Sequence, residues 1–116
     1  MTLNNLIEKL MESGRFEKVS DGADPEREVT GVYCCDLLSI AMGRAPEGSV
    51  WVTVMGNINT LAVAALTDVS CIILAEGVSL DETAAKKAKE QGITVFRTEA
   101  PVFDGALEVY RILGRI

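Results

Sequence analysis

Apolar residues recur along this chain with two different periods, and the changes of period predict its elements. Between residues 3 and 11 the apolar positions fall three and four apart, as on one face of a helix, and Gly14 follows where a left-handed residue commonly ends a helix. Short apolar runs typical of strands then alternate with longer helical stretches. The expected order is helix 3–11, strand 16–19, strand 28–33, helix 35–42, strand 50–55, helix 57–66, strand 71–74, helix 81–91, strand 93–96 and helix 102–113.

This alternation predicts the fold class. Strands joined by helices of this length form βαβ crossovers, and these build a largely parallel sheet that is covered on both faces. A length of 116 residues is that of one ordinary domain. We therefore expect an α/β fold: one three-layer α/β/α domain over residues 1–116, with a mixed, mostly parallel central sheet of about five strands.

The helix expected over 81–91 has the clearest boundaries. Ser79-Leu80-Asp81-Glu82 reads as a capping box. Three lysines fall toward the negative end of the helix dipole, and Gly92 stands at the stop.

Charge and composition exclude several classes of function. The chain has 17 acidic and 11 basic residues, for a formal net charge of -6, which disfavours binding to the phosphates of a nucleic acid. It has no histidine, so a Ser-His-Asp triad or a Cys-His dyad cannot form within one chain. No stretch is long and apolar enough for a membrane span or a signal sequence, and three cysteines without an export signal fit the reducing cytoplasm.

Neither a phosphate-binding loop nor a metal site is expected. Residues 43–49 have the glycine spacing of a P-loop, but Ser49 stands at the position that needs lysine, and the segment follows a helix instead of a strand. Cys34 and Cys35 are adjacent and point to opposite faces of extended backbone, so they cannot chelate one ion together. Cys71 lies in an apolar run typical of a core. We expect no metal and no cofactor.

Two acidic residues stand in the otherwise apolar middle of the chain. Asp36 follows a strand at the position where a helix N-cap is expected, and Asp68 lies in the loop before Val69. Capping and turn formation account for both residues, and catalysis by either is the lesser alternative.

The segment from Met55 to Thr60 connects a strand to a helix and is the best candidate for a ligand site. Backbone N–H groups at such a helix start bind anions, and ligands of open parallel sheets lie beyond the carboxyl ends of the strands. Gly56, Asn57 and Asn59 are the residues there that suit close approach and hydrogen bonding. The alternative, which we rank first, is that Asn57 only caps the helix.

The helix expected over 57–66 is uncharged and apolar on all sides, which predicts an interface. Leu61, Ala64 and Ala65 fill the stripe that faces the sheet. A second copy of the chain would then cover the remaining residues, Ile58, Ala62, Val63 and Leu66. The alternative is that another helix of the same chain, the one that starts at Leu3, covers this side.

The chain resembles the DRTGG domain family from about Leu6 to Leu113. Of the family's naming stretch it keeps Thr30 and Gly31, inside Glu28-Val29-Thr30-Gly31-Val32. The fuller match is Cys35-Asp36-Leu37-Leu38-Ser39, then Met42-Gly43, the strand with Trp51 to Val54, and Asn59 before an Ala-rich helix. With these segments, the candidate ligand-binding residues are Thr30, Gly31, Asp36, Thr53, Gly56, Asn57 and Asn59.

The resemblance implies a three-layer domain with a regulatory or dimerising role, and it assigns no catalytic residue to this sequence. The family is similar to the N-terminal domain of the HPr serine kinase/phosphorylase, whose chemistry belongs to a separate P-loop domain, and some stand-alone relatives accompany iron hydrogenase and other redox genes. We therefore expect a cytoplasmic, non-catalytic regulatory module that acts as a homodimer, with a protein partner in a redox or signalling complex. The alternative is a sensor of a nucleotide or another small anionic ligand, or a weak enzyme, that uses the Met55–Thr60 turn.

Overall fold

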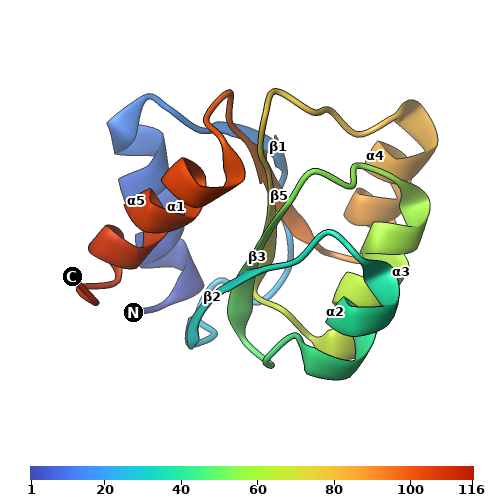
Figure 1. Cartoon of the computed structure of the whole chain (residues 1–116), viewed down its shortest axis with the longest axis horizontal. Coiled ribbons are helices and arrows are strands. Elements are labelled where there is room, and N and C mark those ends of the chain that lie inside the picture. Colours follow the sequence, from blue (N-terminus) through green and yellow to red (C-terminus); the bar gives the residue numbers. More distant parts are fainter.

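A five-stranded sheet divides the molecule into two helical layers, as Figure 1 shows with the sheet seen along its edge. The computed structural model describes all of residues 1–116. Four strands are parallel, and the first is antiparallel to its neighbour. The order across the sheet is β1 (Glu17–Ser20), β5 (Thr94–Arg97), β4 (Cys71–Leu74), β3 (Ser49–Thr53) and β2 (Gly31–Cys34). The expected three-layer α/β fold is confirmed.

Two helices cover one face of the sheet and three cover the other (Figure 1). The first pair is α1 (Leu3–Ser13) and α5 (Val102–Ile112), and the second group is α2 (Leu38–Arg44), α3 (Ile58–Thr67) and α4 (Glu82–Glu90). Each of the three connects two adjacent parallel strands, and crossovers of one hand place their helices on one face. None of the five helices is long and apolar enough to cross a bilayer.

The central strands β3 and β4 are buried on both faces, so their apolar residues, 50–52 and 71–74, follow one another without alternation. Along β3 the side chains of Val50 and Val52 point into the core under α1 and α5, while Trp51 between them points into the core under α2 to α4. The Trp51 indole is fully buried and donates to the Cys35 carbonyl oxygen at 3.0 Å. This bond fixes the segment that follows β2 against β3.

Helix α1 confirms the pattern from which it was predicted. Leu3, Leu6 and Leu10 are buried on one face, as the three- and four-residue spacing requires. Thr2 caps the first turn through its side chain, and Gly14 ends the helix with a φ of 71°.

One predicted helix start and one predicted capping box were wrong. Helix α2 begins at Leu38 and not at residue 35, and its N-cap, Leu37, makes no side-chain capping bond. Asp36 does not cap this helix because its carboxylate is bonded to β3. The cap of α4 is Asp81, which accepts from the Ala84 N–H at 2.7 Å, so Ser79 does not form the expected capping box.

The side of α3 that faces solvent differs in part from the expected one. Leu61 and Ala64 are buried as predicted, but Val63 is also buried, because it packs into the core shared with the flanking helices, and Ala65 is exposed. Ile58, Ala62 and Leu66 remain on the outside. Helix α1 lies on the opposite face of the sheet and cannot cover them (Figure 1).

Candidate functional site

The carboxyl ends of β2 and β3 are joined by a side chain that the sequence singled out. The Oδ1 atom of Asp36 accepts from the Thr53 hydroxyl at 2.7 Å and from the Val54 N–H at 3.0 Å. Thr53 is fully buried, and its Oγ1 in turn accepts from the Met55 N–H at 3.2 Å. The structure thus brings two of the candidate ligand residues together, where they hold the start of the β3–α3 turn.

The same turn packs closely under the segment that precedes α4. A Cβ atom on Gly56 would lie 2.7 Å from the Ser79 carbonyl oxygen and 3.0 Å from Val78 Cγ1. Glycine is therefore required here by the approach of the neighbouring backbone. The space next to Gly56 is filled by the chain itself.

The start of α3 is capped by its own asparagine. Asn57 Oδ1 accepts from the Asn59 N–H at 3.0 Å and from the Thr60 N–H at 3.2 Å. These are two of the four N–H groups that a helix start leaves without a partner and that an anion would use. The capping interpretation of Asn57 is confirmed, and a ligand role for Gly56, Asn57 and Asn59 stays a prediction.

Two of the candidate ligand residues lie at the other end of the sheet. Thr30 and Gly31 are at the start of β2, whereas Asp36 and Asn57 lie beyond the carboxyl ends of the strands. The Thr30 hydroxyl donates to the Glu47 carbonyl oxygen at 2.7 Å. Seven residues predicted as one site therefore form two separate groups, because a strand carries its two ends to opposite edges of the sheet.

The pKa values of two thiols, Cys34 and Cys71, are raised. Burial raises the pKa of Cys71 to about 12. Loss of hydration, and after it the charge of Asp36, raise the pKa of Cys34. A nucleophilic cysteine needs the opposite shift. No group of three or more Cys, Asp or Glu side chains in residues 1–116 lies close enough together to hold a metal ion.

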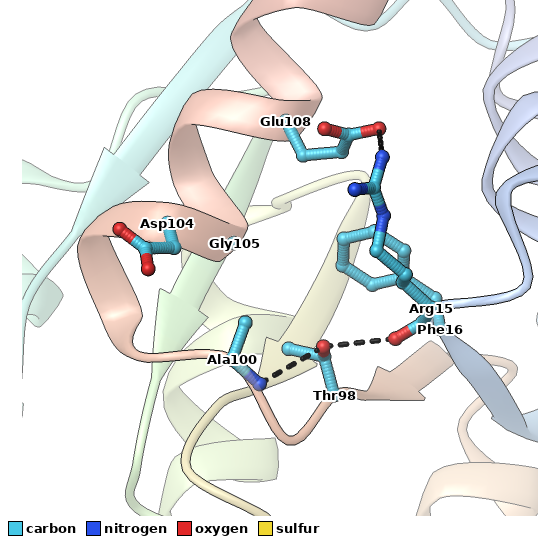
Figure 2. Close-up of a pocket in the computed structure, with 7 residues that line it drawn as sticks. All are labelled: Arg15, Phe16, Thr98, Ala100, Asp104, Gly105 and Glu108. Carbon is cyan, nitrogen blue, oxygen red and sulfur yellow. Dashed lines mark hydrogen bonds and ion pairs between the residues drawn. The ribbon is translucent and has the colours of Figure 1, made fainter.

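A polar pocket of about 230 Å³ lies between the start of β1, the end of β5 and helix α5 (Figure 2). The sequence did not predict it, since its residues come from two distant segments, 15–16 and 98–108. The Arg15 guanidinium reaches across the pocket to Glu108, and the Thr98 hydroxyl donates to the Arg15 carbonyl oxygen at 2.9 Å. Asp104 lies apart from both bonds (Figure 2).

The charges of this pocket disfavour an anionic ligand. Its one guanidinium is already paired, and two carboxylates share the walls. Its volume is also below the roughly 300 Å³ at which ordinary ligand sites begin. The pocket therefore offers neither the charge nor the space that a nucleotide needs.

An apolar groove of about 410 Å³ lies where α5 passes over the edge strand β2. All of its lining residues are hydrophobic, and Phe103 is 71% exposed. Sequence reasoning missed this groove, although the seven-residue spacing of Phe103 and Tyr110 on a helix that already buries Ala106 and Val109 could have indicated a second apolar face. The lining residues are Val32, Cys34, Phe103, Ala106, Leu107, Tyr110 and Ile116, which we call the β2-edge groove.

The fold is similar to that of a solved regulatory region. The solved structure is the crystal structure of the CBS and DRTGG domains of the regulatory region of Clostridium perfringens pyrophosphatase, complexed with its activator, diadenosine tetraphosphate. The TM-score is 0.73 at 17% sequence identity, and the match covers 96% of this chain and 46% of that one. The present chain thus spans about half the length of that structure.

This likeness supports a DRTGG-like fold. The similarity to the N-terminal domain of the HPr serine kinase/phosphorylase stays a prediction. The sequence matches no protein-family model and no curated protein.

Proposed function

We propose that this protein is a non-catalytic regulatory module that works through protein contacts as a homodimer. The observation that carries the proposal is its exposed apolar surface. Leu37 and Ile40 at α2, Ile58 and Leu66 on α3, and Phe103 on α5 are each 40% exposed or more. Monomers of this size rarely expose apolar side chains in neighbouring groups, and such groups mark protein interfaces.

The chemistry of the polar regions supports the same proposal. The Asp36, Thr53 and Asn57 side chains bond to their own chain, and the Cys34 and Cys71 thiols have raised pKa values. The structure that shares the fold belongs to the regulatory region of an enzyme. This likeness supports the regulatory role that we propose for the present chain.

Sedimentation velocity of the purified protein over a range of concentrations tests the homodimer. We expect a species of twice 12.5 kDa that dissociates on dilution. A 12.5 kDa monomer at every concentration would contradict the proposal. Val63→Lys is unsuitable as a probe of the interface, because Val63 is 7% exposed and a buried lysine would unfold the monomer itself.

A sensor of a small anionic ligand is the second candidate, favoured by the activator bound in the structure that shares the fold. Ligand that binds only the folded state must raise its stability, by about 2.7 kcal/mol at a hundred times the Kd. A thermal-shift titration with diadenosine tetraphosphate and with inorganic phosphate measures this. A rise in Tm with the nucleotide would favour the sensor, and an unchanged Tm would favour the contact module.

The partner in a redox or signalling complex and the cytoplasmic location also belong to this proposal, and they rest on the resemblance described from the sequence. Affinity purification of the tagged protein from its own cells tests the redox partner. We expect a stoichiometric redox protein to be retained. The Leu66→Glu variant, altered on the exposed stripe of α3, serves as the matched control.

A further inference from the structure

The strand β2 is an open edge of the sheet. It pairs with β3 on one side and has no neighbouring strand on the other. An open edge presents a row of unpaired N–H and C=O groups that can pair with another strand. The register of the other edge strand, β1, shifts between Lys18 and Ser20, whereas β2 keeps an unbroken register over its four residues.

The register shows which groups of β2 face outward. The Ala75 N–H donates to the Thr53 carbonyl oxygen, so the backbone N–H and C=O groups of Thr53 point toward β4. The backbone groups of the residues before and after Thr53 therefore point the other way, toward β2. Those of Val54 do so, since its N–H donates to Asp36. By the same alternation, the N–H and C=O groups of Val32 and Cys34 point away from β3. These two residues carry the free hydrogen-bonding groups of the edge.

Apolar side chains flank this edge on both faces of the sheet. On one face lies the β2-edge groove, with Phe103, Tyr110 and Ile116 exposed by 71%, 39% and 70%. On the other face the exposed side chains of Leu37 and Ile40 lie three residues apart at the start of α2. Tyr33 of β2 and Leu38 of α2 pack against the core on this same face of the sheet.

The charges at the two ends of β2 have opposite signs. At its start, the Arg115 guanidinium donates to the Thr30 carbonyl oxygen at 2.8 Å. Just beyond its end lies the exposed carboxylate of Asp36. Two copies of this edge placed antiparallel would therefore set the cationic end of each against the anionic end of the other.

We propose that two copies of this chain pair through β2, antiparallel about a two-fold axis at Tyr33, into one continuous ten-stranded sheet. In this register Val32 lies opposite Cys34 of the second copy, so the four outward groups of each strand are satisfied across the axis. Thr30, with Arg115 bound to it, lies opposite Asp36 of the second copy. The apolar side chains of α2 and α5 cover the joint from the two faces.

This assignment rests on the proposed homodimer and names its interface. It differs from the interface expected from the sequence, which lies on α3. The two surfaces are separate, since α3 packs over the interior of the sheet between α2 and α4. Variants of one surface therefore leave the other unchanged.

Removal of one outward N–H gives the sharpest test. Cys34→Pro deletes the N–H that faces away from β3 and leaves the β2–β3 pairing intact, as proline is tolerated on the open side of an edge strand. Cys34→Ala is the matched control, because it removes the thiol and keeps the N–H. We expect Cys34→Pro to raise the dimer Kd at least about tenfold in sedimentation equilibrium, with Cys34→Ala unchanged. Phe103→Glu is the second variant and is expected to weaken the dimer likewise.

Disulfide formation tests the register itself. Opposite residues of an antiparallel pair have Cα atoms about 5.5 Å apart, within the range for a disulfide. We expect Val32→Cys in a Cys35→Ser background to give a covalent dimer on mild oxidation, through a disulfide between position 32 of one copy and Cys34 of the other. The same protein with Cys34→Ser in addition should give no covalent dimer. Ala62→Cys, in a background without Cys34 and Cys35, is the competing probe on α3.

The outcomes separate the two proposals. A protein that is monomeric at every concentration overturns the homodimer. The second outcome is a dimer that is unaffected by Cys34→Pro and Phe103→Glu and forms no disulfide in the Val32→Cys variant. If that dimer is instead dissociated by Leu66→Glu or cross-linked through Ala62→Cys, the homodimer stands and the β2 interface is overturned. A dimer weakened by the β2 variants and linked by Val32→Cys supports it.

Discussion

The turn after β3 and the edge formed by β2 differ in how far their polar groups are satisfied. In the turn, Asp36, Thr53 and Asn57 bond to neighbouring backbone and side-chain groups, and Gly56 lies under the Ser79 carbonyl. Along the edge, one side of β2 has no partner strand and the flanking side chains are apolar and exposed. Polar residues that look functional in the sequence, such as those of the turn, can have their hydrogen bonds used within the fold. The open edge, in contrast, has backbone groups and apolar side chains that a partner can contact.

The largest expected effect comes from the carboxylate that closes the turn. Asp36→Ala removes the acceptor of both the Thr53 hydroxyl and the Val54 N–H, and Thr53 is fully buried. We expect the free energy of unfolding to fall by about 3 kcal/mol, since bonds to a charged acceptor are strong and a buried donor is left without a partner. Urea unfolding measures the loss, and Asp36→Asn, which keeps an acceptor oxygen, is expected to lose less. Equal stability of all three proteins would show that the turn is not closed by this side chain.

A substitution at Gly56 tests the packing of the same turn. Gly56→Ala places a methyl group 2.7 Å from the Ser79 carbonyl oxygen, so one of the two segments must move. We expect a loss of about 2 kcal/mol in urea unfolding, as for other overpacked sites. Gly43→Ala is the control, since nothing lies within 4 Å of the new Cβ and α2 should gain from alanine. A neutral Gly56→Ala would mean that the turn has free space for a ligand.

The buried thiol of Cys71 makes the free energy of unfolding depend on pH in the alkaline range. Burial raises the pKa of Cys71 from 9.0 to about 12, so the unfolded chain releases this proton at lower pH than the folded one. The contribution to stability is therefore complete below pH 9 and falls as the pH rises toward 12. Between pH 7 and pH 10, wild type should lose about 1.4 kcal/mol relative to Cys71→Ala. Parallel curves for the two proteins in urea unfolding at several pH values would contradict this.

The smallest effect on folding is expected at the β2 edge. Phe103→Glu changes a side chain that is 71% exposed, and the free energy of unfolding of the monomer should stay within about 0.5 kcal/mol of wild type. Urea unfolding at a concentration below the dimer Kd measures this. A large loss would mean that Phe103 belongs to the core and that the edge is not a free surface.

The sequence alone was sufficient for the α/β fold, because its evidence is local. The buried strands β3 and β4 contain continuous apolar runs at residues 50–52 and 71–74, and the face formed by Leu3, Leu6 and Leu10 repeats at the helical period. Asn57 was likewise recognised as a cap from its place between strand and helix. Such patterns involve neighbours in the chain, so no knowledge of tertiary contacts is needed.

How these elements pack against one another depends on contacts that the sequence pattern does not contain. Val63 is buried because α3 has a helix on each side, and Thr30 lies far from Asn57 because β2 carries its two ends to opposite edges of the sheet. The β2-edge groove joins Val32 to Phe103, 71 positions along the chain, and strand order alone places β2 at an edge. Periodicity states which face of an element is apolar, but what lies against that face depends on contacts between distant segments, which no local pattern encodes.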